Sequence, residues 1–162
     1  MKPATKSLFK IKSRLADPHE QLRILSDNQA IGIPSFSDRL DNLGLDPLIP
    51  TVIDIFQVNV GNMCNQVCKH CHVDAGPGRK EIMTRETMQL CIDALKHTDI
   101  STVDLTGGAP EMNPDFRWFV EQLSEQGRKI IVRCNLSIIV AHPKYYDLPE
   151  FFRKHKINVV SS

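Results

Sequence analysis

Strand-like and helix-like segments alternate regularly through the second two thirds of this chain. Runs rich in β-branched residues predict strands over 51–60, 101–105, 129–133 and 156–160. The last three runs begin about 28 residues apart, a spacing that suits right-handed strand–helix–strand crossovers. We therefore expect an α/β fold with about four parallel strands and connecting helices.

Each segment between the strands has the features of an amphipathic helix. The first is expected to begin after Thr84 and to end near His97, the second to begin at Pro114, and the third at Pro149. Apolar side chains recur there at spacings of three and four residues, which is typical of one buried helix face. These positions are Met88, Cys91, Ile92 and Leu95 in the first helix, and Phe116, Phe119, Val120 and Leu123 in the second.

The first fifty residues lack this pattern. Proline and glycine interrupt every candidate element there, so residues 1–50 are expected to form a largely irregular extension with at most one short helix. Nothing in the sequence covers the far edge of the last strand, and a parallel sheet normally has its faces and edges covered. We therefore expect residues 51–162 to be part of a larger sheet or barrel, apparently truncated.

Composition limits the partners and the location. Twenty Lys and Arg residues against nineteen Asp and Glu residues give a net charge of +1, so no global field favours a nucleic acid. The longest apolar runs are far shorter than the roughly 20 residues that cross a membrane. Without the apolar core of a secretion signal, and with three of the five cysteines clustered within eight residues, a disulfide framework is not expected. These features predict a cytoplasmic protein whose clustered thiols bind metal.

The clustered thiols are Cys64, Cys68 and Cys71, which directly follow the first predicted strand. The carboxyl ends of parallel strands are where α/β folds bind their ligands. Structural zinc sites use four ligands, whereas a [4Fe-4S] cluster held by three cysteines keeps one iron open. The asymmetric spacing favours the cluster, but a zinc-binding structural or interaction module remains the alternative. The residues that could supply a fourth zinc ligand are His70, His72 and Cys91.

The pattern Cys64-x3-Cys68-x2-Cys71, with Thr106-Gly107-Gly108 after the second strand, resembles the radical S-adenosylmethionine (SAM) superfamily. More narrowly, the runs 57–77, 105–114 and 133–136 resemble the radical SAM proteins assigned to arsenosugar biosynthesis. The resemblance covers about residues 50 to 162. It implies a partial (β/α) barrel of the radical SAM type, in which 51–162 form the N-terminal portion of the core domain.

The resemblance implies a [4Fe-4S] cluster held by Cys64, Cys68 and Cys71, with SAM chelating the fourth iron. Reduction of that cluster would cleave SAM to a 5′-deoxyadenosyl radical, so an electron donor and a small-molecule substrate are implied as partners. The narrower family implies adenosyl transfer to a methylated trivalent arsenical. The alternatives are a radical SAM reaction on another small molecule or peptide, and a fragment without activity. No residue is assigned as a catalytic acid or base.

The resemblance also implies residues that bind SAM. His70 stands where the superfamily usually has an aromatic residue packed near the adenine. At Gly107 and Gly108, missing side chains would let backbone carbonyls approach the SAM ammonium group.

Four further residues each have two possible roles. The superfamily commonly places Glu at position 109, but here Glu111 is the first acid, and it either contacts SAM or faces a helix N-terminus. Ser161 and Ser162 either bind the ribose hydroxyls or belong to a frayed chain end. Cys134, at the mouth of the third strand, either contacts substrate through its thiol or belongs to the core.

Overall fold

The computed structural model describes residues 6–27 and 32–161. Its centre is an open parallel sheet with the strand order β1-β2-β3-β4. The strands are β1 (Ile55–Asn59), β2 (Thr102–Thr106), β3 (Lys129–Arg133) and β4 (Asn158–Val160). This confirms the predicted α/β fold, which is consistent with a partial radical SAM barrel, although β1 is shorter than the 51–60 run.

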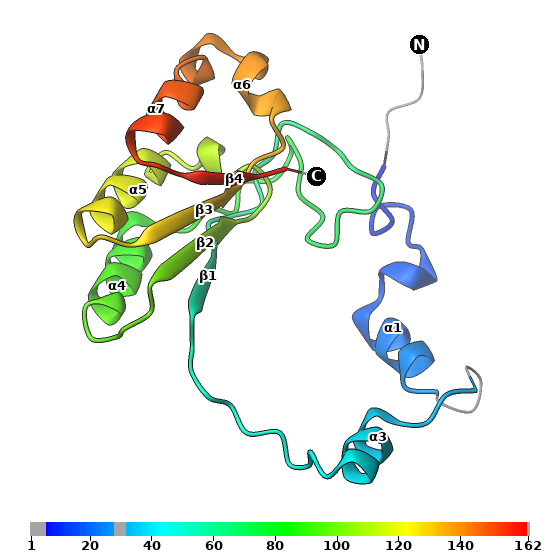
Figure 1. Ribbon diagram of the computed structural model, residues 1–162. Coiled ribbons are helices and arrows are strands. Elements are labelled where there is room, and N and C mark those ends of the chain that lie inside the picture. Colours follow the sequence, from blue (N-terminus) through cyan, green and yellow to red (C-terminus); the bar gives the residue numbers. More distant parts are fainter. Residues whose placement is uncertain (1–5, 28–31, 162) are drawn as a thin grey trace.

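The helices between the strands lie on one face of the sheet (Figure 1). They are α4 (Arg85–Leu95), α5 (Phe116–Glu125) and α7 (Leu148–Lys154). Thr84 caps α4 by accepting a hydrogen bond from the amide of Thr87, as the sequence predicts. The stretch after β3 contains a further short helix that the sequence pattern did not predict, α6 (Ser137–Ala141). Two 3-10 turns, η2 (Pro110–Met112) and η3 (Pro143–Tyr145), complete the connections.

The main core lies between the sheet and these helices. Alternate strand positions such as Val103, Leu105 and Val132 point toward the helices and are fully buried. Phe116 and Phe119 of α5 pack against them with no more than 1% of their surface exposed. Burying a side chain of this size contributes about 1.5–3 kcal/mol. The sheet is thereby held rigid, and the loops at its carboxyl end are carried on a fixed base.

The opposite face of the sheet carries a polar cluster that spans three strands. Asp104 of β2 has only 4% of its side chain exposed and pairs with Arg133 of β3, at 2.8 Å between Oδ2 and Nη2. Gln57 of β1 donates a second hydrogen bond of 2.8 Å to the same oxygen. In (β/α) barrels the face away from the helices lines the interior. This face is therefore built with satisfied polar groups.

The N-terminal part contains more helix than its sequence pattern indicates. The structure has a 3-10 turn η1 (Arg14–Ala16) and two α-helices, α1 (Pro18–Leu25) and α3 (Phe36–Leu43). Their caps are local: Asp17 accepts from the amide of His19, and Ser35 accepts from that of Asp38. Neither helix buries a residue, and both lie well apart from the sheet (Figure 1). Among the described helices, none combines the length and the apolarity needed to cross a membrane.

Candidate functional site

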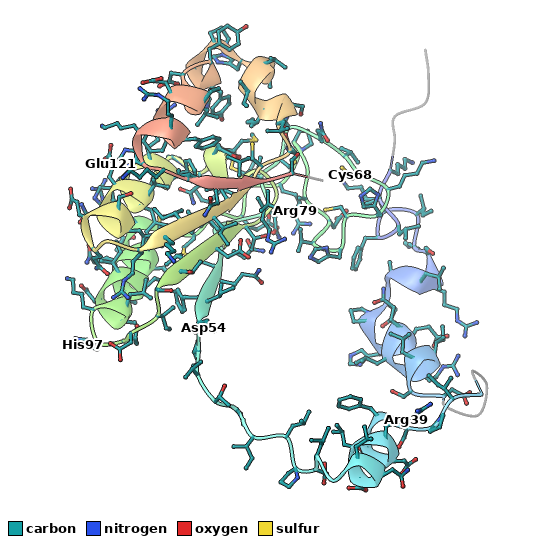
Figure 2. The ribbon with its side chains drawn as sticks, viewed as in Figure 1. Arg39, Asp54, Cys68, Arg79, His97 and Glu121 are labelled. Atoms are coloured by element: carbon teal, nitrogen blue, oxygen red, sulfur yellow. The ribbon has the colours of Figure 1, made fainter. Side chains whose placement is uncertain are left out.

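The three clustered cysteines lie on the loop that follows β1, at the carboxyl end of the sheet. Cys64, Cys68 and Cys71 line one cavity of about 170 Å³ together with Gly107 and Gly108 of the loop after β2. Figure 2 shows Cys68 on this loop, on the side of the N-terminal segment. The other residues that line the cavity are Gln66, His70, His72, Ala75 and Asn135. Residues about 70 positions apart in the chain, such as Cys64 and Asn135, thus meet at one site.

Direct backbone contacts hold the two loops together. The amide of Gly108 donates to the carbonyl of Gly61 at 2.9 Å, and that of Ala109 donates to the carbonyl of Met63 at 2.8 Å. A Cβ atom at Gly107 would lie 2.4 Å from the Gly61 oxygen, and one at Gly108 would lie 2.4 Å from the Met63 oxygen. Gly107 also has a φ of +147°, which side chains rarely adopt. Both glycines are therefore needed for loop docking, and their contact with SAM stays a prediction.

Two of the three thiols accept hydrogen bonds, whereas the Cys68 thiol donates to Oε1 of Gln66 at 3.8 Å. The Sγ atom of Cys64 accepts from the backbone amide of Gln66 at 3.4 Å and from Nδ2 of Asn135 at 3.5 Å. The Sγ atom of Cys71 accepts from the amide of Ala75 at 3.3 Å. Burial raises the pKa of the Cys64 thiol, and its two donors oppose that rise. Donors of this kind stabilise sulfur that carries negative charge, as metal-bound thiolates do.

The described residues do not form a closed site for a single metal ion. Across 6–27 and 32–161, no three His, Cys, Asp or Glu side chains converge closely enough to hold one ion. A closed zinc site needs four ligands around one point. In a [4Fe-4S] cluster each thiolate binds a different iron, so the three sulfur atoms line a cavity instead of meeting. Cys64, Cys68 and Cys71 line one cavity without forming such a group, so a cluster held by these three residues stays a prediction.

A side-chain network ties the cysteine loop to the connection between β3 and α6. Nδ2 of Asn135 donates to Oδ1 of Asn65 at 2.9 Å, and Nδ2 of Asn65 donates to Oγ of Ser137 at 2.8 Å. Nε2 of Gln66 reaches the same hydroxyl at 2.5 Å. This network could not be predicted from the sequence, because isolated Asn, Gln and Ser residues have no diagnostic spacing. The sequence offered only one hint of these contacts: Asn65 and Gln66 directly follow Cys64, and Asn135 and Ser137 directly follow the third strand.

A second cavity of about 270 Å³ lies at the ends of β2, β3 and β4. It shares Gly107, Gly108, His72 and Asn135 with the first cavity. Ser161 and Cys134 also line it, whereas Ser162 lies outside the described residues. The ribose and substrate roles of Ser161 and Cys134 stay predictions, and both residues are placed beside the cysteine loop.

Cys134 and Glu111 form a buried pair of ionisable side chains. Cys134 is 1% exposed, and burial together with the charge of Glu111 raises the pKa of its thiol to about 12. Glu111, in η2, is 5% exposed, and neither of its carboxylate oxygens has a hydrogen-bond partner among the described residues. Burial raises the pKa of this carboxyl. Glu111 lines neither of the two cavities, so its contact with SAM also stays a prediction.

His70 lies between the cysteine loop and the N-terminal segment. It is exposed, and besides the first cavity it lines another of about 310 Å³ together with Cys71, Leu8 and Phe9. The amide of Leu8 donates to the carbonyl of Lys69 at 3.2 Å. This contact was missed from sequence, because the extension was expected to contribute little. A packing role of His70 against adenine stays a prediction.

The open parallel sheet with its connecting helices is consistent with a partial radical SAM barrel. The model of the radical SAM superfamily matches residues 58–161, and the chain belongs to this superfamily. Membership implies a [4Fe-4S] cluster and SAM as cofactors, and radical SAM enzymes act on small-molecule substrates with the help of electron donors.

The chain is also similar to curated proteins of one archaeon. It is 29% identical over 93 residues, 57% of this chain, to a probable GTP 3′,8-cyclase of Saccharolobus islandicus strain Y.N.15.51. The corresponding proteins of strains L.S.2.15 and Y.G.57.14 are 29% identical over 75 residues, 46% of this chain. The matches cover 30% of the first relative and 24% of the other two, so the chain spans less than a third of their length.

Proposed function

We propose that this chain belongs to a radical SAM enzyme in which Cys64, Cys68 and Cys71 hold a [4Fe-4S] cluster and SAM binds beside it. The proposal is supported mainly by the one cavity that the three thiols share with Gly107 and Gly108. When bound, the cluster supplies the electron for reductive cleavage of SAM. A reducing compartment such as the cytoplasm suits the five free thiols of the chain.

The protein's own residues bind and orient SAM. Backbone carbonyls at the Gly107-Gly108 turn accept hydrogen bonds from the SAM ammonium group, and Ser161 binds the ribose hydroxyls. His70 packs near the adenine from the cysteine loop. The second cavity, which contains Ser161 and adjoins the first, gives the nucleoside a place to extend. Glu111 lies beside Cys134, and burial raises the pKa of its carboxyl.

For the reaction we propose adenosyl transfer to a methylated trivalent arsenical, with Cys134 facing the substrate. The motifs around the three cysteines and after β2 and β3 support this choice by their resemblance to arsenosugar proteins. The raised pKa of about 12 keeps the Cys134 thiol protonated at neutral pH, so a bond between its sulfur and the arsenical would require loss of that proton.

A second candidate reaction is cyclisation of a purine nucleoside triphosphate. It is favoured by the 29% identity to probable GTP 3′,8-cyclases. Equilibrium binding distinguishes the two substrates: titration of the SAM-loaded protein with GTP and, separately, with a dimethylated trivalent arsenical. Saturable binding of GTP alone would reject the arsenical, and binding of the arsenical alone would reject the cyclase reaction.

The cofactor proposal is tested by anaerobic reconstitution with iron and sulfide, followed by electron paramagnetic resonance of the reduced protein. We expect a [4Fe-4S]+ signal that changes when SAM is added. Replacing Cys64, Cys68 or Cys71 by Ala should abolish the signal. The matched control is Cys91→Ala, since Cys91 lies on α4 and lines neither cavity. Stoichiometric zinc with no cluster would favour the structural module instead.

A further inference from the structure

We propose that Asn135 sets the reduction potential of the cluster by donating a hydrogen bond to the Cys64 sulfur. This inference rests on the proposed function, because it requires a cluster on Cys64. It concerns a side chain from a different loop, placed after β3, that reaches the cysteine loop from the far side of the cavity. Asn135 thus acts on the cluster through its ligand.

The orientation of the Asn135 amide is fixed by its other contacts. Its Oδ1 atom accepts from the backbone amide of Ile138 at 3.1 Å and from Oγ of Ser137 at 3.1 Å. A backbone amide can only donate, so the atom facing it is the oxygen. The Nδ2 group must then point toward the cysteine loop, where it lies 3.5 Å from Sγ of Cys64 and 2.9 Å from Oδ1 of Asn65.

Among the described residues that donate hydrogen bonds to Cys64 and Cys71, Asn135 donates from its side chain and the others donate from their backbone amides. The amides of Gln66 and Ala75 also point at Cys64 and Cys71, but a substitution cannot remove a backbone N–H group. Cys64 is also the most buried of the three ligands, with 6% exposed. A hydrogen bond to charge is stronger where water is excluded. Asn135 is therefore placed where one donor has a large effect.

The sign of the effect follows from charge. Reduction adds an electron to the cluster, and the extra negative charge is spread partly onto the cysteine sulfur atoms. A donor at Cys64 stabilises the reduced form more than the oxidised form, so hydrogen bonds to sulfur raise the potential. Removing the Asn135 donor should therefore lower the potential and make the cluster harder to reduce.

Two variants remove the donor in different ways. Asn135→Asp keeps the shape and the oxygen that accepts from Ile138, but replaces the Nδ2 donor with a charged acceptor. Asn135→Ala removes the whole amide. The matched control is Ser137→Ala. It removes the hydrogen bonds that Asn65 and Gln66 donate to the Ser137 hydroxyl and the one that this hydroxyl donates to the Asn135 oxygen. The amide of Ile138 still holds the Asn135 oxygen, and Asn135 keeps its donor to Cys64.

The experiment is an anaerobic redox titration of the reconstituted full chain, followed by visible absorption and electron paramagnetic resonance. We expect both Asn135 variants to lower the equilibrium constant for one-electron reduction by roughly three- to tenfold, where tenfold corresponds to 59 mV. The Asp variant should shift further than the Ala variant, because it adds a like charge. Ser137→Ala should change the constant by less than about twofold.

The possible results separate the two proposals. If the unsubstituted chain takes up no cluster, the proposed function fails and this inference fails with it. If the cluster forms but the Asn135 variants titrate like the unsubstituted chain, only the inference fails. An equal shift in Ser137→Ala would attribute the effect to loop position instead of the hydrogen bond. If Asn135→Ala loses its cluster, the reduction potential of Asn135→Asp provides the test. If both variants lose the cluster while their circular dichroism is unchanged, Asn135 is needed to hold the cluster, and the proposal that it only sets the potential is wrong.

Discussion

Replacing Gly108 by Ala should strongly destabilise the protein by forcing the loop after β2 away from the cysteine loop. The new Cβ would lie 2.4 Å from the carbonyl oxygen of Met63 and 2.9 Å from Cβ of Ala75. Both neighbours belong to the loop that docks there, and a backbone oxygen cannot move aside as a flexible side-chain end can. The two loops would have to separate.

The expected cost follows from the contacts that separation disturbs. Overpacking by one methyl group costs about 1–3 kcal/mol. The hydrogen bonds from the amides of Gly108 and Ala109, at 2.9 and 2.8 Å, would weaken, at about 1 kcal/mol each. We therefore expect the free energy of unfolding to fall by about 2–4 kcal/mol, a large part of the 5–15 kcal/mol that holds a typical domain.

Urea denaturation followed by circular dichroism measures this loss. The matched control is Gly78→Ala on the cysteine loop that Gly108 contacts, where an added Cβ meets nothing within 4 Å. That variant should stay within about 0.5 kcal/mol of the parent. If Gly108→Ala unfolds at the same urea concentration as Gly78→Ala, the close loop contact does not exist in solution.

Three other substitutions test separate features of the fold. Glu111→Gln should stabilise the protein at pH 8 but have little effect at pH 5. Burial raises the pKa of the Glu111 carboxyl in the folded state above its ordinary value of 4.5, so the free energy of unfolding falls as the pH rises above 4.5. Equal effects at both pH values, measured by urea denaturation, would contradict this reasoning. Arg128→Ala should lower the melting temperature and cost about 2 kcal/mol, because the guanidinium donates to the backbone carbonyls of 95, 98 and 100. Phe119→Ala, fully buried, should cost about 3–5 kcal/mol in the same urea assay, whereas Leu90→Ala, with Leu90 69% exposed, should change stability by less than about 0.5 kcal/mol.

The sheet and its helices were predictable because their signals are local and repeated. The apolar positions of 116, 119, 120 and 123 predict the buried face of α5, and the structure buries all four. The caps of α1 and α3 are equally local, but a single Asp17 or Ser35 carries little weight in a stretch without apolar periodicity. Helix α6 was missed because it is short and begins after Leu136, a residue with φ of +51° that no sequence rule anticipates.

The site was predictable only in part. Spacing alone marks the three thiols, and the parallel topology predicts that they lie beside the Gly107-Gly108 turn, where the structure places them. The burial of Glu111 without a partner could not be foreseen, since it depends on how η2 packs beside Cys134. The contact between Asn135 and Cys64 depends on the three-dimensional position of two loops, and an isolated Asn carries no sequence signal for it.

The polar cluster on the uncovered face of the sheet also protects the alignment of its strands. Side chains alternate between the two faces, so sliding β2 by one residue against its neighbours would turn Asp104 toward the helices and into the apolar core. There it would lose both Arg133 and Gln57 and leave a carboxylate among Val and Leu side chains. The free-energy cost of a slipped strand is therefore larger than the loss of apolar packing alone would make it. The charged pair selects one strand register as the chain folds, and with it the position of every loop at the carboxyl edge.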